Sequence, residues 1–200
     1  MKRVVVGGQS RNIGKTSLAV SLISAMPELG WTAVKVTLFG HGICSQDGRP
    51  CDCAVDDPDH PFLISRETDP DGSSDTSRML RAGARKALWV RAPQGRLGEA
   101  MPALEAYLRA DEHVLFESNS VLDFFTPDLY VVLLDPRVED FKPSARRLLG
   151  RADAFAVSGS TPSAGSQLSK DTADRPVFPV APPCWSCDKL AAFARDRVKG

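Results

Sequence analysis

The chain has 200 residues with 25 basic and 25 acidic side chains, which give a formal net charge of zero. This length suits one compact domain with a substantial core, so we expect a single domain spanning 1–200. The balanced charge gives no general attraction to nucleic acid or to an anionic membrane, and no stretch is apolar enough to span a bilayer. The apolar run after Lys2 and Arg3 is too short for a secretory signal, so we predict a cytoplasmic protein with neither nucleic-acid nor membrane partners.

Short apolar runs rich in β-branched residues alternate along the chain with segments whose apolar residues recur at helical spacing. In chain order, we predict a strand at 3–8, a helix at 15–26, a strand at 31–39, a helix at 75–87, a strand at 87–92, a helix at 99–110, strands at 112–118 and 128–135, a helix at 141–152, strands at 153–159 and 175–183, and a helix at 187–200. The insert at about 40–74 is rich in Gly, Pro, Asp and Cys, and an insert of this length in a compact domain is usually functional or disordered. The alternation predicts an α/β fold with a mostly parallel sheet flanked by helices on both faces.

The first predicted strand runs into the sequence GGQSRNIGKTS, which opens the first predicted helix. The strict phosphate-loop pattern G-x-x-x-x-G-K-[ST] requires glycine at position 9, where the chain has Gln9, so five residues instead of four separate Gly8 from Gly14. Strand, glycine-rich turn and helix still follow in the order that gathers backbone N–H groups and the positive end of a helix dipole around a phosphate. Lys15 would add a charge for the β- and γ-phosphates, and Thr16 a hydroxyl for Mg²⁺. The structural alternative is a glycine turn before a helix that happens to begin with Lys-Thr.

The nucleotide-binding residues that we predict are Gly8, Gln9, Ser10, Arg11, Asn12, Ile13, Gly14, Lys15, Thr16 and Ser17.

Two acids are placed to complete such a site, because Mg²⁺ prefers a few carboxylates together with water. Glu117 ends the apolar run VLFE, at the strand end where ligands of open α/β sheets bind, although a solvated strand-end acid is the structural alternative. Asp75 begins the predicted helix at 75–87, where it could equally act as a helix cap. We predict Thr16, Glu117 and Asp75 as Mg²⁺ ligands, and Lys15, Glu117 and Asp75 as catalytic residues.

Several segments resemble known families. The spacing of the glycine-rich loop resembles that of dethiobiotin synthetase and of the cobyrinic and cobyric acid amidases, which belong to the signal-recognition-particle/MinD/BioD (SIMIBI) class of P-loop NTPases. The segments VKVTLFGHG and DTSRMLRAGA resemble the MobB family of molybdopterin-guanine dinucleotide biosynthesis. The residues that match MobB positions are Lys35, Thr37, His41, Asp75, Thr76, Arg78, Ala82, Gly83 and Ala84.

The resemblance to MobB touches nearly the whole chain and implies a P-loop NTPase fold that binds GTP or ATP with Mg²⁺. It also implies a role in molybdenum-cofactor or other metallocofactor biosynthesis. The departures are the glycine spacing of the loop, which is one residue longer here, and the cysteines of the 40–74 insert. Ser118 stands where the synthetases carry a glycine after the strand-end Glu. The sequence AFAVSGS stands where GTPases of related folds carry the Asn-Lys-x-Asp motif of guanine recognition, and the choice between ATP and GTP stays open.

Five cysteines fall into two groups, with Cys44, Cys51 and Cys53 in the insert and Cys184 and Cys187 in the motif CWSC. In a cytoplasmic protein we expect thiols or metal ligands rather than disulfides. Both groups follow strands of the predicted parallel sheet, so they could meet at one edge and bind zinc or an iron–sulfur cluster. Free thiols, a redox pair in CWSC and a metal held by the insert alone stay open as alternatives.

The sequence therefore predicts a Mg²⁺-dependent nucleoside triphosphatase that acts through positioning and charge stabilisation. Three alternatives stay open: a nucleotide-binding adaptor that hands a cofactor to a partner, a metal-delivery protein, and a ligase similar to dethiobiotin synthetase. The partners that we consider, besides the nucleotide, are a protein of cofactor biosynthesis and a second copy of the chain.

Overall fold

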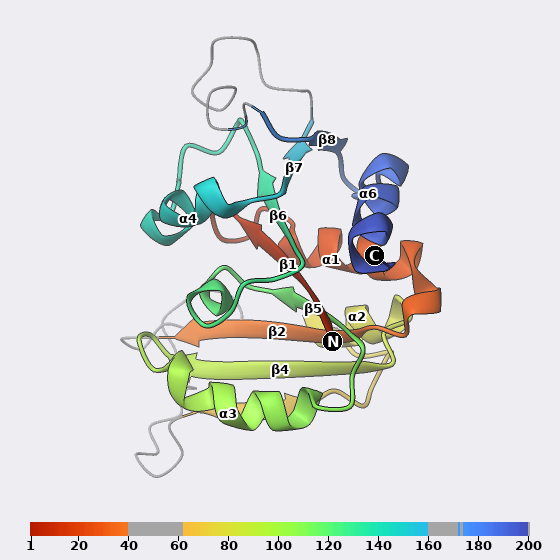
Figure 1. Ribbon diagram of the computed structural model, residues 1–200, viewed down its shortest axis with the longest axis vertical. Helices are drawn as coiled ribbons and strands as arrows, with labels where there is room; N and C mark the ends of the chain where they lie inside the picture. The colour runs from red at the N-terminus through yellow and green to blue at the C-terminus, as the bar shows by residue number, and fades with distance from the viewer. Residues whose placement is uncertain (40–61, 160–171, 173, 200) are drawn as a thin grey trace.

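The computed structural model describes residues 1–39, 62–159, 172 and 174–199 and centres on an eight-stranded sheet (Figure 1). The strands are β1 (Lys2–Gly8), β2 (Thr32–Phe39), β3 (Leu63–Arg66), β4 (Lys86–Pro93), β5 (His113–Glu117), β6 (Leu129–Leu134), β7 (Ala154–Ser158) and β8 (Val177–Val180). They are arranged in the order β3-β4-β2-β5-β1-β6-β7-β8. β3 runs antiparallel to β4, whereas every other neighbouring pair is parallel. The predicted α/β fold with a mostly parallel sheet is therefore confirmed.

Helices cover both faces of the sheet, as predicted. The α-helices are α1 (Lys15–Ala25), α2 (Asp75–Arg81), α3 (Leu97–Leu108), α4 (Pro143–Leu148) and α6 (Asp188–Lys199), and the short 3₁₀ helices are η1 (Pro27–Leu29), η2 (Ser120–Asp123) and η3 (Leu149–Arg151). Buried side chains of α1, α2 and α6 pack with Val4 and Val6 of β1, whereas those of α3 and α4 pack with Val5. This division follows from the pleat of β1, which points successive side chains to opposite faces.

The structure differs from the prediction around the insert. β3 lies within the segment that we predicted to be without regular structure, because its four side chains are exposed or half-buried and give no strong apolar signal. α2 ends at Arg81, earlier than predicted, and Gly83 then adopts a left-handed φ of 104° that ends the helical path.

The parallel strands end at one edge of the sheet, where the glycine-rich turn and Glu117 lie. β1 ends there at Gly8, β5 at Glu117, and the segment after β8 returns to the same edge. Among the described residues, no helix combines the length and the apolar content needed to cross a membrane.

Candidate functional site

The glycine-rich loop (residues 8–14) joins the end of β1 to the start of α1. Gly14 is the N-cap of α1 and has a left-handed φ of 103°, a conformation that suits glycine. Within the described residues, this N-terminus has no side-chain cap, and its first turn contains no acid. The backbone N–H groups of the first turn are thus left for another acceptor, and the helix dipole favours an anion at this position.

Gln9, the residue that departs from the strict glycine pattern, fastens the glycine-rich loop to the segment after β6. Its side chain is buried, donating from Nε2 to the carbonyl of Val138 at 2.7 Å and accepting at Oε1 from the backbone N–H of Asp135 at 2.7 Å. Its own backbone donates to Leu133 at 3.1 Å and accepts from the N–H of Lys142 at 2.9 Å. A glycine could make only the backbone contacts. The two side-chain hydrogen bonds of Gln9 therefore hold the loop in a way that the sequence pattern did not reveal.

Asn119 holds the other side of the loop. Its Oδ1 accepts from the backbone N–H of Gly8 at 3.0 Å, and its Nδ2 donates to the Gly8 carbonyl at 2.9 Å. The hydroxyl of Tyr130 donates to the same Oδ1 at 3.3 Å. A Cβ on Gly7 would lie 2.1 Å from this oxygen, so the close approach requires glycine there.

Trp185 covers the end of the glycine-rich loop. A Cβ built on Gly14 would lie 2.4 Å from the indole Cη2, so the ring rests directly on the Gly14 backbone. Trp185 has a left-handed φ of 54° and donates its backbone N–H to the carbonyl of Ala181 at 2.9 Å. The contact brings the segment after the last strand onto the loop, and no local sequence signal predicts it.

Three of the predicted side chains converge beside the loop in what we call the oxygen cluster (Thr16, Asp75 and Glu117). Thr16 Oγ1 donates to Glu117 Oε2 at 2.8 Å. Lys35 Nζ, from β2, contacts Asp75 Oδ2 and lies 3.5 Å from both Glu117 Oε2 and Thr16 Oγ1. The roles of these residues remain predictions, but the structure brings the oxygens close enough to share one cation.

Lys15, which follows the loop, carries a charge in a largely enclosed position. Its Nζ donates to the carbonyl of Ser10 at 2.7 Å, so the ammonium points into the curve of the loop. Burial lowers the pKa of Lys15 despite the nearby charge of Glu117, and the charges of Lys35 and Arg11 lower it further. An anion in the loop would favour the charged form of Lys15.

The pKa values of the two acids in the oxygen cluster shift in opposite directions. Burial raises the pKa of Glu117, whose exposed fraction is 6%, although the charges of Lys35 and Lys15 act against it. Burial also acts to raise the pKa of Asp75, but the hydrogen bond and charge of Lys35 outweigh it and leave that pKa below its ordinary value. Carboxylate and hydroxyl oxygens are the donors that Mg²⁺ prefers, so the residues present fit that ion.

The remaining loop residues differ in exposure. Arg11 and Asn12 are exposed at the tip, where Asn12 has a left-handed φ of 55°. Ile13 is buried, and Ser10 donates its hydroxyl to the carbonyl of Arg11 at 3.1 Å. Ser17 lies in the first turn of α1, where its Oγ accepts from Arg78 at 2.8 Å.

Lys142 adds a cation near the loop that the sequence analysis did not single out. Burial lowers its pKa to about 8, and the charges of Lys15 and Arg11 contribute to this decrease. Three cationic side chains therefore influence one another around the same loop.

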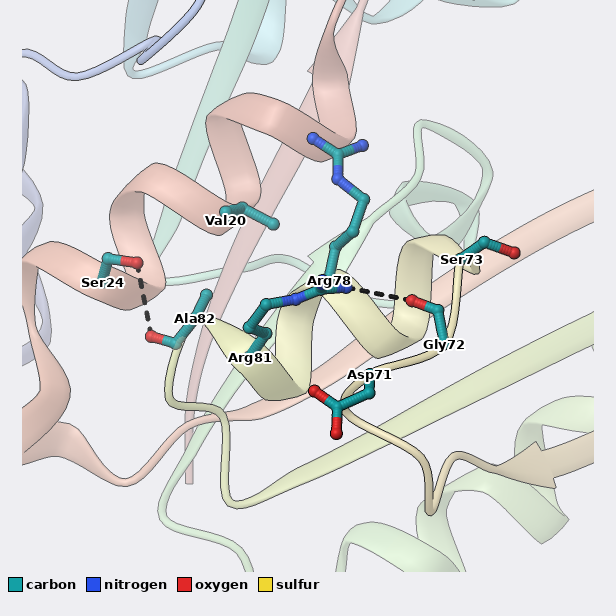
Figure 2. A pocket seen from close by; sticks show the side chains of 8 residues that line it. All are labelled: Val20, Ser24, Asp71, Gly72, Ser73, Arg78, Arg81 and Ala82. Atoms are coloured by element: carbon teal, nitrogen blue, oxygen red, sulfur yellow. Dashed lines mark hydrogen bonds between the residues drawn. The ribbon is translucent and has the colours of Figure 1, made fainter.

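An open groove of about 680 Å³ lies between α1 and α2 (Figure 2). One of its lining residues, Arg78, also contacts the oxygen cluster through Asp75. Arg78 links the two regions, because it bonds Asp75 at 3.2 Å and Ser17 at 2.8 Å, while Arg81 donates to the Gly72 carbonyl at 3.0 Å. The lining residues are Val20, Ser24, Asp71, Gly72, Ser73, Arg78, Arg81 and Ala82. None of these belongs to the glycine-rich loop, so the groove is a neighbour of the loop and not a part of it.

The cysteines are only partly described. Cys184 is an exposed thiol and Cys187 a half-buried one, on either side of Trp185. Cys44, Cys51 and Cys53 lie outside the described residues, as does His41. Within the described ranges, no three His, Cys, Asp or Glu side chains are grouped as metal ligands.

No protein-family model matches the sequence, and a search of curated proteins finds no match. Among solved structures, the chain is similar to the "apo" form of LpxK from Aquifex aeolicus in complex with ATP, with 16% identity and a TM-score of 0.49. That match covers 90% of this chain and 53% of the LpxK chain, so this chain spans about half the length of LpxK. It is also similar to the MinC:MinD cell division protein complex of Aquifex aeolicus, with 12% identity, a TM-score of 0.46 and coverage of 98% of this chain and 86% of that chain.

Proposed function

We propose that the chain binds a nucleoside triphosphate, ATP or GTP, together with Mg²⁺ and hydrolyses it. The observation that carries this proposal is the convergence of an uncapped helix N-terminus, Lys15 and the oxygen cluster at one edge of the sheet. The N–H groups and the ammonium suit a polyphosphate, and the oxygens beside them suit the cation that accompanies it.

The protein groups divide the work by position. The backbone of the glycine-rich loop and Lys15 hold the phosphates, and Gln9 and Asn119 keep the loop in shape through the contacts described above. Thr16, Asp75 and Glu117 would hold Mg²⁺, which when bound supplies positive charge against the phosphate oxygens. The protein thus contributes binding, orientation and charge, and needs no covalent intermediate.

A role in molybdenum-cofactor or metallocofactor biosynthesis is the finer part of the proposal. It depends on the resemblance of the Lys35 and Asp75 segments to MobB. Cys184 and Cys187 would supply two ligands of an additional thiolate metal site, because C-x-x-C spacing lets both sulfurs face one ion. Protein purified without chelator should then carry about one zinc or iron per chain, and a Cys184→Ser variant less; a metal-free wild type would remove this site from the proposal.

Binding can be measured with Lys15→Met. The wild type should bind fluorescent ATP or GTP analogues in the presence of Mg²⁺, and the variant should lose binding by about 100-fold or more, because the ammonium that would face the phosphates is lost. Lys2→Met is a matched control, since Lys2 begins β1 at its opposite end. Wild-type protein that binds neither nucleotide, or a Lys15 variant that binds as well as the control, would contradict the proposal.

A further inference from the structure

Lys35 lies at the centre of the oxygen cluster. It sits on β2 opposite Glu117 of β5 in the parallel register, and its side chain is only 18% exposed. Its ammonium contacts Asp75 Oδ2 and lies 3.5 Å from both Glu117 Oε2 and Thr16 Oγ1. A single cation therefore already faces every oxygen that the proposed function assigns to Mg²⁺.

Glu117 is buried, so its carboxylate needs a cation nearby, and Lys35 supplies it. A buried carboxylate is costly unless a cation or hydrogen-bond donors compensate it. Glu117 receives one hydrogen bond from Thr16, and among the described residues Lys35 is the cationic side chain in direct ion-pair contact with it. Lys15 is engaged with the Ser10 carbonyl, and Arg78 bonds the other oxygen of Asp75. Lys35 is thus the counter-ion of the cluster.

We propose that the Lys35 ammonium must leave the oxygen cluster before a divalent cation can bind there, so that Lys35 couples cation binding to the arrival of the polyphosphate. The inference rests on the proposed function, which supplies the identity of the site. Two cations cannot share the same oxygens without strong repulsion at such distances. The lysine side chain has a flexible stem, so the ammonium can rotate away. An incoming anion at the glycine-rich loop offers the released ammonium a new partner, which makes the two binding events favour each other.

The test measures Mn²⁺ binding to the nucleotide-free protein by electron paramagnetic resonance of the free ion. Wild-type protein should bind Mn²⁺ weakly, and Lys35→Met should bind it about tenfold or more tightly, a change within the usual range of coupling between sites. Lys35→Gln, which keeps a polar end without the charge, should show the same increase and serves if the Met variant does not fold. Lys35→Arg should bind Mn²⁺ as weakly as the wild type.

Lys86→Met is the matched control. Lys86 is 17% exposed and contacts another buried carboxylate, that of Asp111, at 2.5 Å. The proposal is wrong if removing Lys86 tightens Mn²⁺ binding as much as removing Lys35 does, or if neither Lys35→Met nor Lys35→Gln tightens it. A second readout is thermal stability without nucleotide. Added Mn²⁺ should raise the melting temperature of Lys35→Met by several degrees and that of the wild type hardly at all.

This experiment separates the inference from the proposed function, because no nucleotide is present. Failure of nucleotide binding in the Lys15 experiment would leave the Mn²⁺ result unchanged. Conversely, wild-type protein that binds nucleotide normally while Lys35→Met shows no gain for Mn²⁺ would overturn only the role of Lys35.

Discussion

Two lysines contact buried carboxylates at opposite ends of the strands, and the surroundings of the two lysines differ. Lys86 begins β4 and contacts Asp111, which also receives Arg85 at 3.0 Å. Lys35 instead faces two carboxylates and a hydroxyl at the edge where the strands end. Both lysines are similarly buried, at 17% and 18% exposure. The charge of Asp111 is balanced by two cationic side chains of the protein itself. The oxygens around Lys35 instead lie beside an uncapped helix N-terminus, where an anionic ligand and its cation could bind.

Turnover should differ most between variants of the two acidic sites. Glu117→Gln keeps an acceptor for Thr16 but removes the buried one of the two carboxylates of the oxygen cluster, so phosphate release should fall by about 100-fold or more. Asp111→Asn, which removes the carboxylate that pairs with Lys86 and Arg85, should lower stability and leave turnover per folded molecule nearly unchanged. Steady-state release of inorganic phosphate measures both variants. Equal losses of turnover in Glu117→Gln and Asp111→Asn would mean that the two acidic sites do not differ in function.

A second prediction compares the stability of the two lysine variants. Lys86→Met leaves Asp111 with Arg85 alone and also removes the hydrogen bond to the Tyr107 carbonyl, so it should destabilise the protein by about 2–3 kcal/mol. Mg²⁺ should not restore this loss. Lys35→Met should cost less without Mg²⁺, since Glu117 keeps its hydrogen bond from Thr16 and Asp75 keeps its bond from Arg78, and Mg²⁺ should recover the stability. The free energy of unfolding in urea, measured with and without Mg²⁺, distinguishes Lys86→Met from Lys35→Met. Recovery of the Lys86 variant by Mg²⁺ would contradict the distinction.

The smallest effect concerns Lys142 and pH. Its folded-state pKa of about 8 is below the ordinary 10.5, so between these values the unfolded chain binds more protons and stability rises with pH. Below the folded pKa the native protein carries the full cost of the charge. Lys142→Met should therefore stabilise nucleotide-free protein by about 1 kcal/mol near pH 7, a figure reduced for solvent screening of a half-exposed side chain.

The gain from Lys142→Met should shrink towards zero as the pH rises to the ordinary lysine value. Thermal unfolding near neutral pH and again in alkaline buffer measures it, with Lys189→Met, exposed on α6, as the control. A gain of the same size at both pH values would show that lost charge is not the cause.

Most of the fold could be predicted from the sequence, and so could the positions of Thr16 and Glu117 in the candidate site, because both depend on local patterns. The apolar residues of α1 recur at helical spacing, and Glu117 follows an apolar strand, so their positions could be inferred from short stretches of chain. β3 was missed, since four half-exposed residues give no periodic signal and its pairing with β4 is what stabilises it.

The contacts that shape the glycine-rich loop could not be inferred in this way. Gln9 bonds Asp135 and Val138, and Trp185 lies on Gly14, so the partners are far apart in sequence. No local pattern encodes such pairs, because they form only when the sheet brings distant strand ends to one edge. Lys35 entered the sequence analysis only through a family resemblance, and its place among the oxygens emerged from the register of β2 and β5.

The indole that rests on Gly14 has a consequence for how the protein is made. During synthesis the first strand and helix leave the ribosome long before the tryptophan does. The turn between them therefore acquires the shape described here only after the segment that carries Trp185 has also emerged. The contact thus makes the final form of the turn depend on a segment synthesised more than 160 residues later.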